Sequence, residues 1–318
     1  MDNYYDVIVI GGGPAGLTAG IYLSRAKLKT LIINEGAVGG QLVLTHEIAN
    51  YPGVESISGY ELARNMKLQA QKFGCIIKSN TKITSVELKD DLKKVIVNNK
   101  DTYTSDAVIF TTGGRSRTIG AAGEDLFKGK GISYCATCDG DFFQDKEIIV
   151  VGGGNTALEE AVSLTKYASK VTIVHQFDHF QAFEHYVGEA KKNEKISFIM
   201  SSEITEFKGD EKLRSVSIKD KITGEISEMK IDGVFIFIGY VPNTESLESL
   251  IELNQWKEIV TDKDMKTNVP GVFAAGDSIQ KKYRQVTTAV SDGTIAALSA
   301  AEFVNNLKRE KVETELAV

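Results

Sequence analysis

The sequence predicts an α/β fold with two related domains, and two pairs of similar segments within the chain support this prediction. The segment DVIVIGGGPAG at 6–16 resembles EIIVVGGGNTA at 147–157, and DAVIFTTGG at 106–114 resembles DGVFIFIG at 232–239. In the first pair an apolar strand runs into a glycine turn and the start of a helix, as in a Rossmann-like unit. Internal repeats separated by this many residues indicate two related domains rather than a solenoid. We therefore expect two Rossmann-like domains of three-layer β/β/α architecture.

The hydrophobic pattern places the elements of each domain. In the first half it predicts strand 6–10, helix 14–26, strand 30–34 and short strands near 75–78, 82–88, 94–98 and 103–110. In the second half it predicts strand 147–151, helix 155–168, strand 171–175 and strands near 196–200, 203–208, 213–219 and 225–238. A long helix is expected from about Gln285 to Asn306, and the polar tail from Lys308 is expected to fray.

Composition narrows the classes of function. A chain of 318 residues is too long for one typical core, and its net charge of −6 argues against general binding of nucleic acid. The sequence contains no run of 18 apolar residues, so no membrane span is expected. The first strand begins close to Met1, which predicts that there is no signal peptide and favours a cytoplasmic protein.

The first glycine fingerprint predicts a dinucleotide site. Gly11, Gly13 and Gly16 give G-x-G-x-x-G directly after a strand and at the start of a helix. Glycines let the backbone approach a pyrophosphate, and the helix N-terminus presents N–H donors to an anion. Glu35 lies at the end of the next predicted strand, where a carboxylate can accept hydrogen bonds from a ribose. The alternative is that the glycines serve only close packing of helix and strand.

Further segments resemble the FAD-binding signature of the low-molecular-weight thioredoxin reductases. They are GGQL at 39–42, NYPG at 50–53, TTGG at 111–114, VFAAGD at 272–277 and RQVTTAVSDG at 284–293. The resemblance implies an FAD domain formed by residues 1–115 and 243–318, with a pyridine-nucleotide-like domain at 116–242 inserted between them. It also implies a homodimer. The residues expected at the FAD are Gly11, Gly13, Pro14, Ala15, Gly16, Glu35, Gly40, Gln41, Asn50, Ile83, Gly276, Asp277, Arg284, Gln285 and Val286.

A pair of cysteines lies just before the second glycine fingerprint. In SYCATCDGDFF at 133–143, Cys135 and Cys138 form a C-x-x-C, which fits half of a metal site or a redox dithiol. A structural zinc site normally has four ligands, but the third cysteine, Cys75, is distant in sequence. We therefore favour the dithiol, expect no metal, and expect Cys75 to be a buried inert thiol.

CATCDG resembles the redox sequence of the thioredoxin reductases. The resemblance implies that Cys138 lies nearer the flavin and that Cys135 more readily meets the protein substrate, thioredoxin. Which of the two attacks thioredoxin is left open. Asp139 is implied as the proton donor and acceptor of the dithiol, and the alternative for this residue is a helix cap or turn.

The second fingerprint lacks the residues that recognise a nicotinamide nucleotide. Gly152, Gly154 and Ala157 keep the phosphate-binding pattern. In the NADPH-dependent members that the chain resembles, the following strand ends in a histidine and two arginines, with a third arginine four residues on. Here His175 is followed by Gln176 and Phe177, and position 181 is Gln. Because arginine binds phosphate through paired charge-assisted hydrogen bonds, binding of NADPH or NADH is doubtful.

The lost arginines raise the question of the electron donor. The sequence is similar to ferredoxin-linked flavin thioredoxin reductases, which keep FAD and CATC without the basic cluster, so reduced ferredoxin is the expected donor. Lys281, Lys282 and Arg284 are candidates for meeting an acidic ferredoxin, and a solvated charged loop is the alternative. Two other functions remain open: an NAD(P)H-dependent reductase with weakened 2′-phosphate recognition, and a dithiol oxidase. A flavin-binding redox sensor is the hypothesis outside enzymes. Residues 113–115 and 239–242 are hinge candidates.

Overall fold

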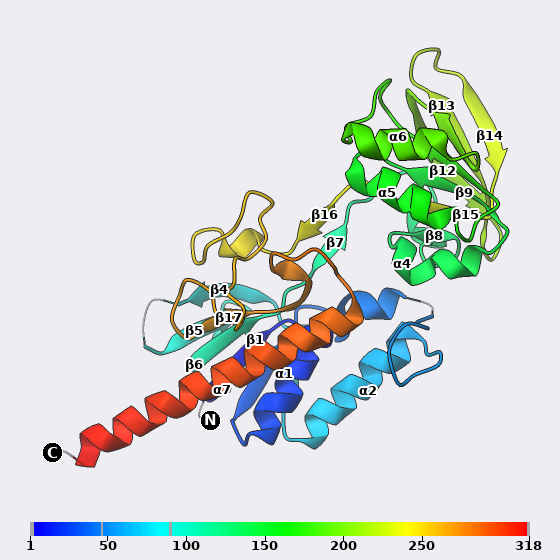
Figure 1. Ribbon diagram of the computed structural model, residues 1–318. Helices are drawn as coiled ribbons and strands as arrows, with labels where there is room; N and C mark the ends of the chain where they lie inside the picture. Colours follow the sequence, from blue (N-terminus) through cyan, green and yellow to red (C-terminus); the bar gives the residue numbers. More distant parts are fainter. Residues whose placement is uncertain (1–2, 46, 89–90, 317–318) are drawn as a thin grey trace. The chain divides into compact units, whose positions relative to one another are not determined.

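The computed structural model describes residues 3–45, 47–88 and 91–316, and it divides into two compact units (Figure 1). One unit combines Met1–Arg115 with Val241–Val318, and is called here the discontinuous unit. The other comprises Ser116–Tyr240 and is called the inserted unit. The chain passes between them through strands β7 (Gly114–Ser116) and β16 (Tyr240–Pro242), which pair with each other.

The discontinuous unit is built on a seven-stranded sheet of order β3-β2-β1-β6-β5-β4, with β17 paired to β6. Its strands are β1 (Tyr4–Ile10), β2 (Thr30–Ile33), β3 (Ile76–Lys78), β4 (Ile83–Glu87), β5 (Lys93–Val97), β6 (Asp101–Phe110) and β17 (Val272–Ala274). The pairs β1–β2, β2–β3, β1–β6 and β17–β6 are parallel, whereas β4, β5 and β6 form an antiparallel meander. Its helices are α1 (Pro14–Arg25), α2 (Gly59–Lys72) and α7 (Val286–Leu316), with short helical turns η1 (Gly40–Leu44), η3 (Glu245–Leu247) and η4 (Gly276–Ser278).

Alternation along β1 explains why this sheet has two buried faces. Successive side chains of a strand point to opposite faces. Val7 and Val9 accordingly pack in a cluster with residues of α1, α2 and α7, while Ile8 and Ile10 pack in a second cluster with residues of β5 and β17. A strand buried on both sides has a continuous apolar sequence, which is why VIVI was recognisable.

The inserted unit contains a parallel sheet and an antiparallel sheet. The parallel sheet has the order β11-β10-β9-β15-β8, and the antiparallel sheet has the order β12-β13-β14. The strands are β8 (Ile132–Ser133), β9 (Glu147–Val151), β10 (Lys170–Val174), β11 (Ile196–Ile199), β12 (Ser202–Gly209), β13 (Leu213–Asp220), β14 (Ile226–Lys230) and β15 (Gly233–Ile236). The helices are α3 (Glu124–Phe127), α4 (Ala136–Asp139), η2 (Gly140–Phe143), α5 (Asn155–Leu164) and α6 (Glu184–Lys192). This is the expected α/β fold with two Rossmann-type units, one inserted into the other.

Two sequence-based expectations about elements are wrong. The single strand expected at 225–238 is two strands, because the chain leaves β14 of one sheet at Ile231 and enters β15 of the other at Gly233. The tail from Lys308 does not fray but continues α7 to Leu316. Ion pairs hold the extension against the sheet, from Lys308 to Asp6 at 2.7 Å and from Lys311 to Asp106 at 3.7 Å. Among the described residues, no helix is both long and apolar enough to cross a membrane.

Candidate active site

The turn from β1 into α1 has a backbone that only glycine allows. Gly11 has φ +112°, in the region that favours glycine. A Cβ on Gly16 would lie 2.0 Å from the carbonyl oxygen of Gly11, so the helix could not start so close to the strand. Pro14 is the first residue of α1, where its missing N–H costs nothing, and Gly13 precedes it as the N-cap residue. Sequence reasoning therefore located this loop correctly.

Two polar residues fix the loop: Asn34, which sequence reasoning missed, and Thr111, which lies in the TTGG segment but was given no role of its own. Asn34, at the end of β2, accepts a hydrogen bond from the N–H of Gly12 at 2.8 Å. Thr111, at the end of β6, donates from its hydroxyl to the carbonyl oxygen of Gly11 at 2.9 Å. Both residues directly follow strands that are parallel to β1, so the carboxyl ends of these strands, and the two residues with them, lie at the same edge of the sheet as the glycine loop. Their position directly after an apolar strand was the available signal.

The structure brings several predicted FAD residues to this edge. The carboxylate of Glu35 is exposed and accepts a hydrogen bond from the N–H of Ile83 at 3.0 Å, so these two residues lie together. Gly40 lies against Gly13, because a Cβ on Gly40 would be 3.1 Å from the Cα of Gly13. Gln41, in η1, and Asn50, in the loop after it, have exposed side chains.

The segment at η4 packs against the start of α1. Gly276 has φ +80°, and a Cβ there would lie 2.9 Å from the Cβ of Ala15. The Oδ1 atom of Asp277 is buried and has no hydrogen-bond partner among the described residues. Burial raises the pKa of this carboxyl, against the opposing charges of Lys281 and Arg284. A buried carboxylate oxygen without a donor is costly, so the site calls for a ligand that supplies one.

These observations fit FAD. The glycine loop and the N-terminus of α1 offer N–H groups to a pyrophosphate, Glu35 offers a carboxylate to a ribose, and Asp277 offers an acceptor to a hydroxyl of the flavin side chain. All of these residues belong to the discontinuous unit.

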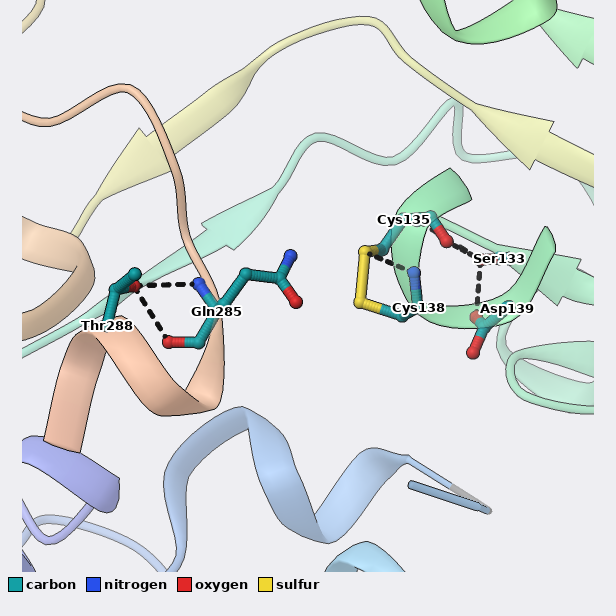
Figure 2. Close-up of a disulfide and its surroundings, with 6 residues drawn as sticks. All are labelled: Ser133, Cys135, Cys138, Asp139, Gln285 and Thr288. Atoms are coloured by element: carbon teal, nitrogen blue, oxygen red, sulfur yellow. Dashed lines mark hydrogen bonds between the residues drawn. A yellow bond between two sulfur atoms is a disulfide. The ribbon is translucent and has the colours of Figure 1, made fainter. Parts of the chain in front are cut away.

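The loop before α7 does not support the expectation that Lys281 and Arg284 form a docking surface for an acidic ferredoxin. Lys281 forms an ion pair with Asp292, and their side chains are 12% and 13% exposed; Arg284 forms an ion pair with Glu258. Both cations are thus neutralised inside their own unit, which disfavours them as a docking surface for an acidic partner, whereas Lys282 is exposed. At the start of α7 the hydroxyl of Thr288 accepts a hydrogen bond from the N–H of Gln285 at 3.1 Å (Figure 2), and Val286 follows as the first helical residue.

Cys135 and Cys138 form a disulfide in the inserted unit, with their Cα atoms 5.3 Å apart (Figure 2). Cys135 is the N-cap of α4, and its Sγ accepts a hydrogen bond from the N–H of Cys138 at 3.1 Å. The third cysteine, Cys75, is buried in the other unit, and burial raises the pKa of its thiol to about 12, which makes it inert.

Asp139 lies at the end of α4 and is held by a side chain that sequence reasoning did not single out. The hydroxyl of Ser133 donates to its Oδ2 at 2.5 Å (Figure 2). The pKa of Asp139 is raised, mainly by burial and further by the charge of Asp141, while the hydrogen bond from Ser133 acts in the opposite direction. The carboxylate makes no side-chain cap at η2, so the alternative of a capping residue is not supported.

Tyr134, between Ser133 and Cys135, anchors the start of the dithiol loop. Its hydroxyl donates to Glu124 at 2.6 Å, and Glu124, which is 4% exposed, also accepts from the N–H of Gly120 at 2.8 Å. Burial, and after it the hydrogen-bonded carboxylate of Glu124, raise the pKa of Tyr134, so the phenol stays protonated as a donor.

The second glycine loop keeps its backbone form, but the three positions at which arginines were looked for carry no charge. Gly152 has φ +138°, and the ring of His175 lies so close to Gly153 that a Cβ there would be 2.4 Å from it. His175 is 4% exposed, and burial lowers the pKa of its imidazole, so it is neutral. The N–H of Gln181 donates to the carbonyl oxygen of Gly153 at 2.8 Å. The side chains of Gln176, Phe177 and Gln181 are exposed, and none carries a charge.

Comparisons with known proteins agree with this site. The model of the family "pyridine nucleotide-disulphide oxidoreductase" matches residues 5–293. The chain is 48% identical to a thioredoxin reductase of Peptoclostridium acidaminophilum, over 96% of this chain and 98% of that protein. It is 44% identical to a 34.2 kDa protein of the rubredoxin operon of Clostridium pasteurianum, over 95% and 98%. It is similar to the crystal structure of thioredoxin reductase from Streptococcus pyogenes, with a TM-score of 0.93, 39% identity and coverage of 96% and 100%.

With an FAD cradle in one unit and a C-x-x-C disulfide in the other, the chain belongs to the pyridine nucleotide-disulphide oxidoreductase family and, within it, to the low-molecular-weight thioredoxin reductases, which are FAD enzymes.

Proposed function

We propose that this protein reduces the disulfide of thioredoxin with electrons that come from reduced ferredoxin rather than from NADPH. The observation that carries the donor assignment is the side chains at positions 176, 177 and 181, which are Gln, Phe and Gln and lie exposed beside the second glycine loop. The main-chain bond from Gln181 to Gly153 fixes this segment against that loop. A nucleotide bound there would meet no cationic fork for its 2′-phosphate at these three positions.

The three uncharged side chains predict a large loss of affinity for NADPH. A hydrogen bond that involves a charged group contributes about 1.5–3 kcal/mol. Losing two or three of them weakens NADPH binding by several kcal/mol, and each 1.4 kcal/mol is about tenfold in affinity. We therefore expect the affinity for NADPH to be at least about a hundredfold below that of an arginine-bearing site.

One observation favours a second candidate, an NAD(P)H-dependent reductase with weakened 2′-phosphate recognition. The loop Gly152–Gly154 still enters the N-terminus of α5 with positive φ at Gly152, which is the geometry that binds a pyrophosphate.

The proposed chemistry takes place at the dithiol. FAD, when bound, supplies a two-electron carrier between the outside donor and the disulfide. Two reduced ferredoxins give one electron each, and these two electrons break the S–S bond of Cys135 and Cys138; the carboxyl group of Asp139 protonates one sulfur, and the other stays a thiolate. A thiolate of the pair then attacks the thioredoxin disulfide, and the second sulfur resolves the mixed disulfide, so that dithiol thioredoxin leaves and the Cys135–Cys138 bond forms again. We propose that the protein acts as a homodimer, as the family resemblance implies, and that it acts in the cytoplasm.

The decisive experiment compares donors and restores the missing charges. Anaerobic stopped-flow absorbance of the FAD-loaded protein should show rapid loss of flavin absorbance with reduced ferredoxin and little with NADPH or NADH. The triple variant Gln176→Arg, Phe177→Arg and Gln181→Arg should gain reduction by NADPH by at least about tenfold and prefer it over NADH, because only NADPH carries the 2′-phosphate.

Two controls make the result interpretable. Cys138→Ser should still accept electrons from the donor but should not reduce thioredoxin, which separates flavin reduction from the dithiol step. Rapid reduction of the unaltered protein by micromolar NADPH would overturn the donor proposal in favour of the second candidate. Oxygen consumption in place of thioredoxin turnover would identify a dithiol oxidase.

A further inference from the structure

Ser133 stands at a junction between the sheet and the dithiol loop. It is the last residue of β8 and is 5% exposed. The register of β8 against β15 pairs Ser133 with Phe235, whose side chain is fully buried. A core strand therefore fixes the position of this hydroxyl group, independently of the loop that carries the cysteines.

The hydroxyl of Ser133 connects the two functional parts of the loop. It donates to the Oδ2 atom of Asp139 at 2.5 Å and accepts a hydrogen bond from the N–H of Cys135 at 3.1 Å (Figure 2). The carbonyl oxygen of Cys135 is also near, at 3.3 Å, but the hydroxyl has one proton, and the carboxylate is the closer acceptor. One side chain thus holds both the carboxylate and the first residue of the C-x-x-C.

We propose that Ser133 is the positioning residue for proton transfer at the dithiol, acting through Asp139. The proposal rests on the role of Asp139 in the proposed function. When the disulfide opens, the carboxyl group of Asp139 gives a proton to a sulfur and becomes the carboxylate that the Ser133 hydroxyl receives. When the disulfide forms again, Asp139 takes back the proton of the remaining thiol, and the two thioredoxin sulfurs take their protons from solvent, so that thioredoxin leaves as its dithiol.

The electrostatics of the site agree with this geometry. Burial and the charge of Asp141 disfavour the carboxylate, whereas the hydrogen bond from Ser133 favours it. The influences that shift the pKa of Asp139 among the described residues are these three, and the reduced dithiol would add its own charge. Loss of the Ser133 hydroxyl should therefore raise the pKa of Asp139 further and leave less of the proton-accepting form at a given acidic pH.

The experiment uses the FAD-loaded protein, reduced by stoichiometric dithionite so that the natural donor does not matter. The rate of oxidation by thioredoxin disulfide is measured against pH. We expect Ser133→Ala to be about tenfold slower near neutral pH, with the acidic limb of its profile moved to higher pH. Ser133→Thr keeps the hydroxyl and should restore both the rate and the position of the acidic limb. Infrared spectra against pH should show the carboxyl C=O band persisting to higher pH in Ser133→Ala, and the Asp139→Asn spectrum identifies that band.

A matched control and a double variant separate positioning from general structure. Ser215, which is 6% exposed, donates to Glu228 at 2.9 Å in the same unit, so Ser215→Ala removes a hydrogen bond of the same kind away from the dithiol and should leave rate and profile unchanged. In the Asp139→Asn background, Ser133→Ala should add no further loss. Ser133→Gly provides a second variant without the hydroxyl if Ser133→Ala folds poorly.

The outcomes distinguish this proposal from the one on which it rests. An unchanged pH profile and infrared band in Ser133→Ala, or an equal loss in the Asp139→Asn background, would overturn the role of Ser133. Full activity of Asp139→Asn would overturn the role of Asp139 itself, whatever Ser133 does. Neither result depends on whether ferredoxin or NADPH is the donor.

Discussion

At the scale of single residues, Gly16 is predicted to be indispensable for holding FAD. A Cβ at this position would meet the carbonyl oxygen of Gly11 at 2.0 Å and the hydroxyl of Thr111 at 2.6 Å. The backbone of the glycine loop would have to move, and overpacking of this kind costs about 1–3 kcal/mol. Gly16→Ala should therefore purify with little flavin and a lower melting temperature, as measured by the ratio of flavin to protein absorbance and by thermal unfolding.

Gly36→Ala is the matched control for this prediction. Gly36 lies in the same unit, shortly after β2, and a Cβ there would meet nothing within 4 Å. It should keep its flavin and its melting temperature. Full flavin content in Gly16→Ala would mean that the loop has more freedom than its contacts indicate.

Some residues of the site could be predicted from the sequence, and others could not. Gly11 and Gly16 were recognisable because backbone geometry selects glycine whatever surrounds it. Asn34, Thr111 and Ser133 were not singled out, because their importance lies in bonds to residues far along the chain or around a turn. Whether a polar side chain after a strand meets a glycine loop depends on the order of strands in the sheet, which the local pattern does not contain.

At the scale of elements, the ion pair of Lys281 with Asp292 is predicted to fasten the loop after η4 to α7. Asp292 also accepts a hydrogen bond from the N–H of Gly276 at 3.2 Å, so one carboxylate holds both parts of the segment next to Asp277. Asp292→Asn keeps the shape but removes the carboxylate that pairs with Lys281, which is 12% exposed. The expected loss is about 2–3 kcal/mol of the free energy of unfolding, somewhat below that for fully buried pairs, and urea unfolding followed by circular dichroism measures it.

An exposed pair in the same unit serves as the comparison. Glu248 and Lys257 lie 3.2 Å apart with side chains 51% and 60% exposed, and Glu248→Gln should change stability by less than about 1 kcal/mol. Equal effects of the two substitutions would show that burial of the Lys281–Asp292 pair does not matter.

Elements were predictable where a short pattern decides them and not where tertiary contacts do. The β-α-β starts at β1 and β9 follow from apolar strands that end in glycines. The apolar run at 225–238 could not reveal that the chain changes sheets between β14 and β15, since both halves favour strands. The continuation of α7 to Leu316 brings Lys308 and Lys311 to Asp6 on β1 and Asp106 on β6, contacts with residues far away along the chain that a local pattern does not contain.

At the scale of the whole molecule, charge predicts how an acidic donor such as ferredoxin meets the protein. The chain carries a net charge of −6, and Lys281 and Arg284 are neutralised by Asp292 and Glu258. Long-range attraction of an anionic protein should therefore be weak, and salt screens what repulsion exists, with a Debye length of about 8 Å at physiological ionic strength. The second-order rate of flavin reduction by ferredoxin should stay level or rise as salt is added. Lys282→Gln, which removes the exposed cation beside the pairs, should change this rate less than about twofold. A rate that falls steeply with salt would instead reveal a basic docking surface formed by other residues, and charge-reversal variants of exposed lysines would then locate it.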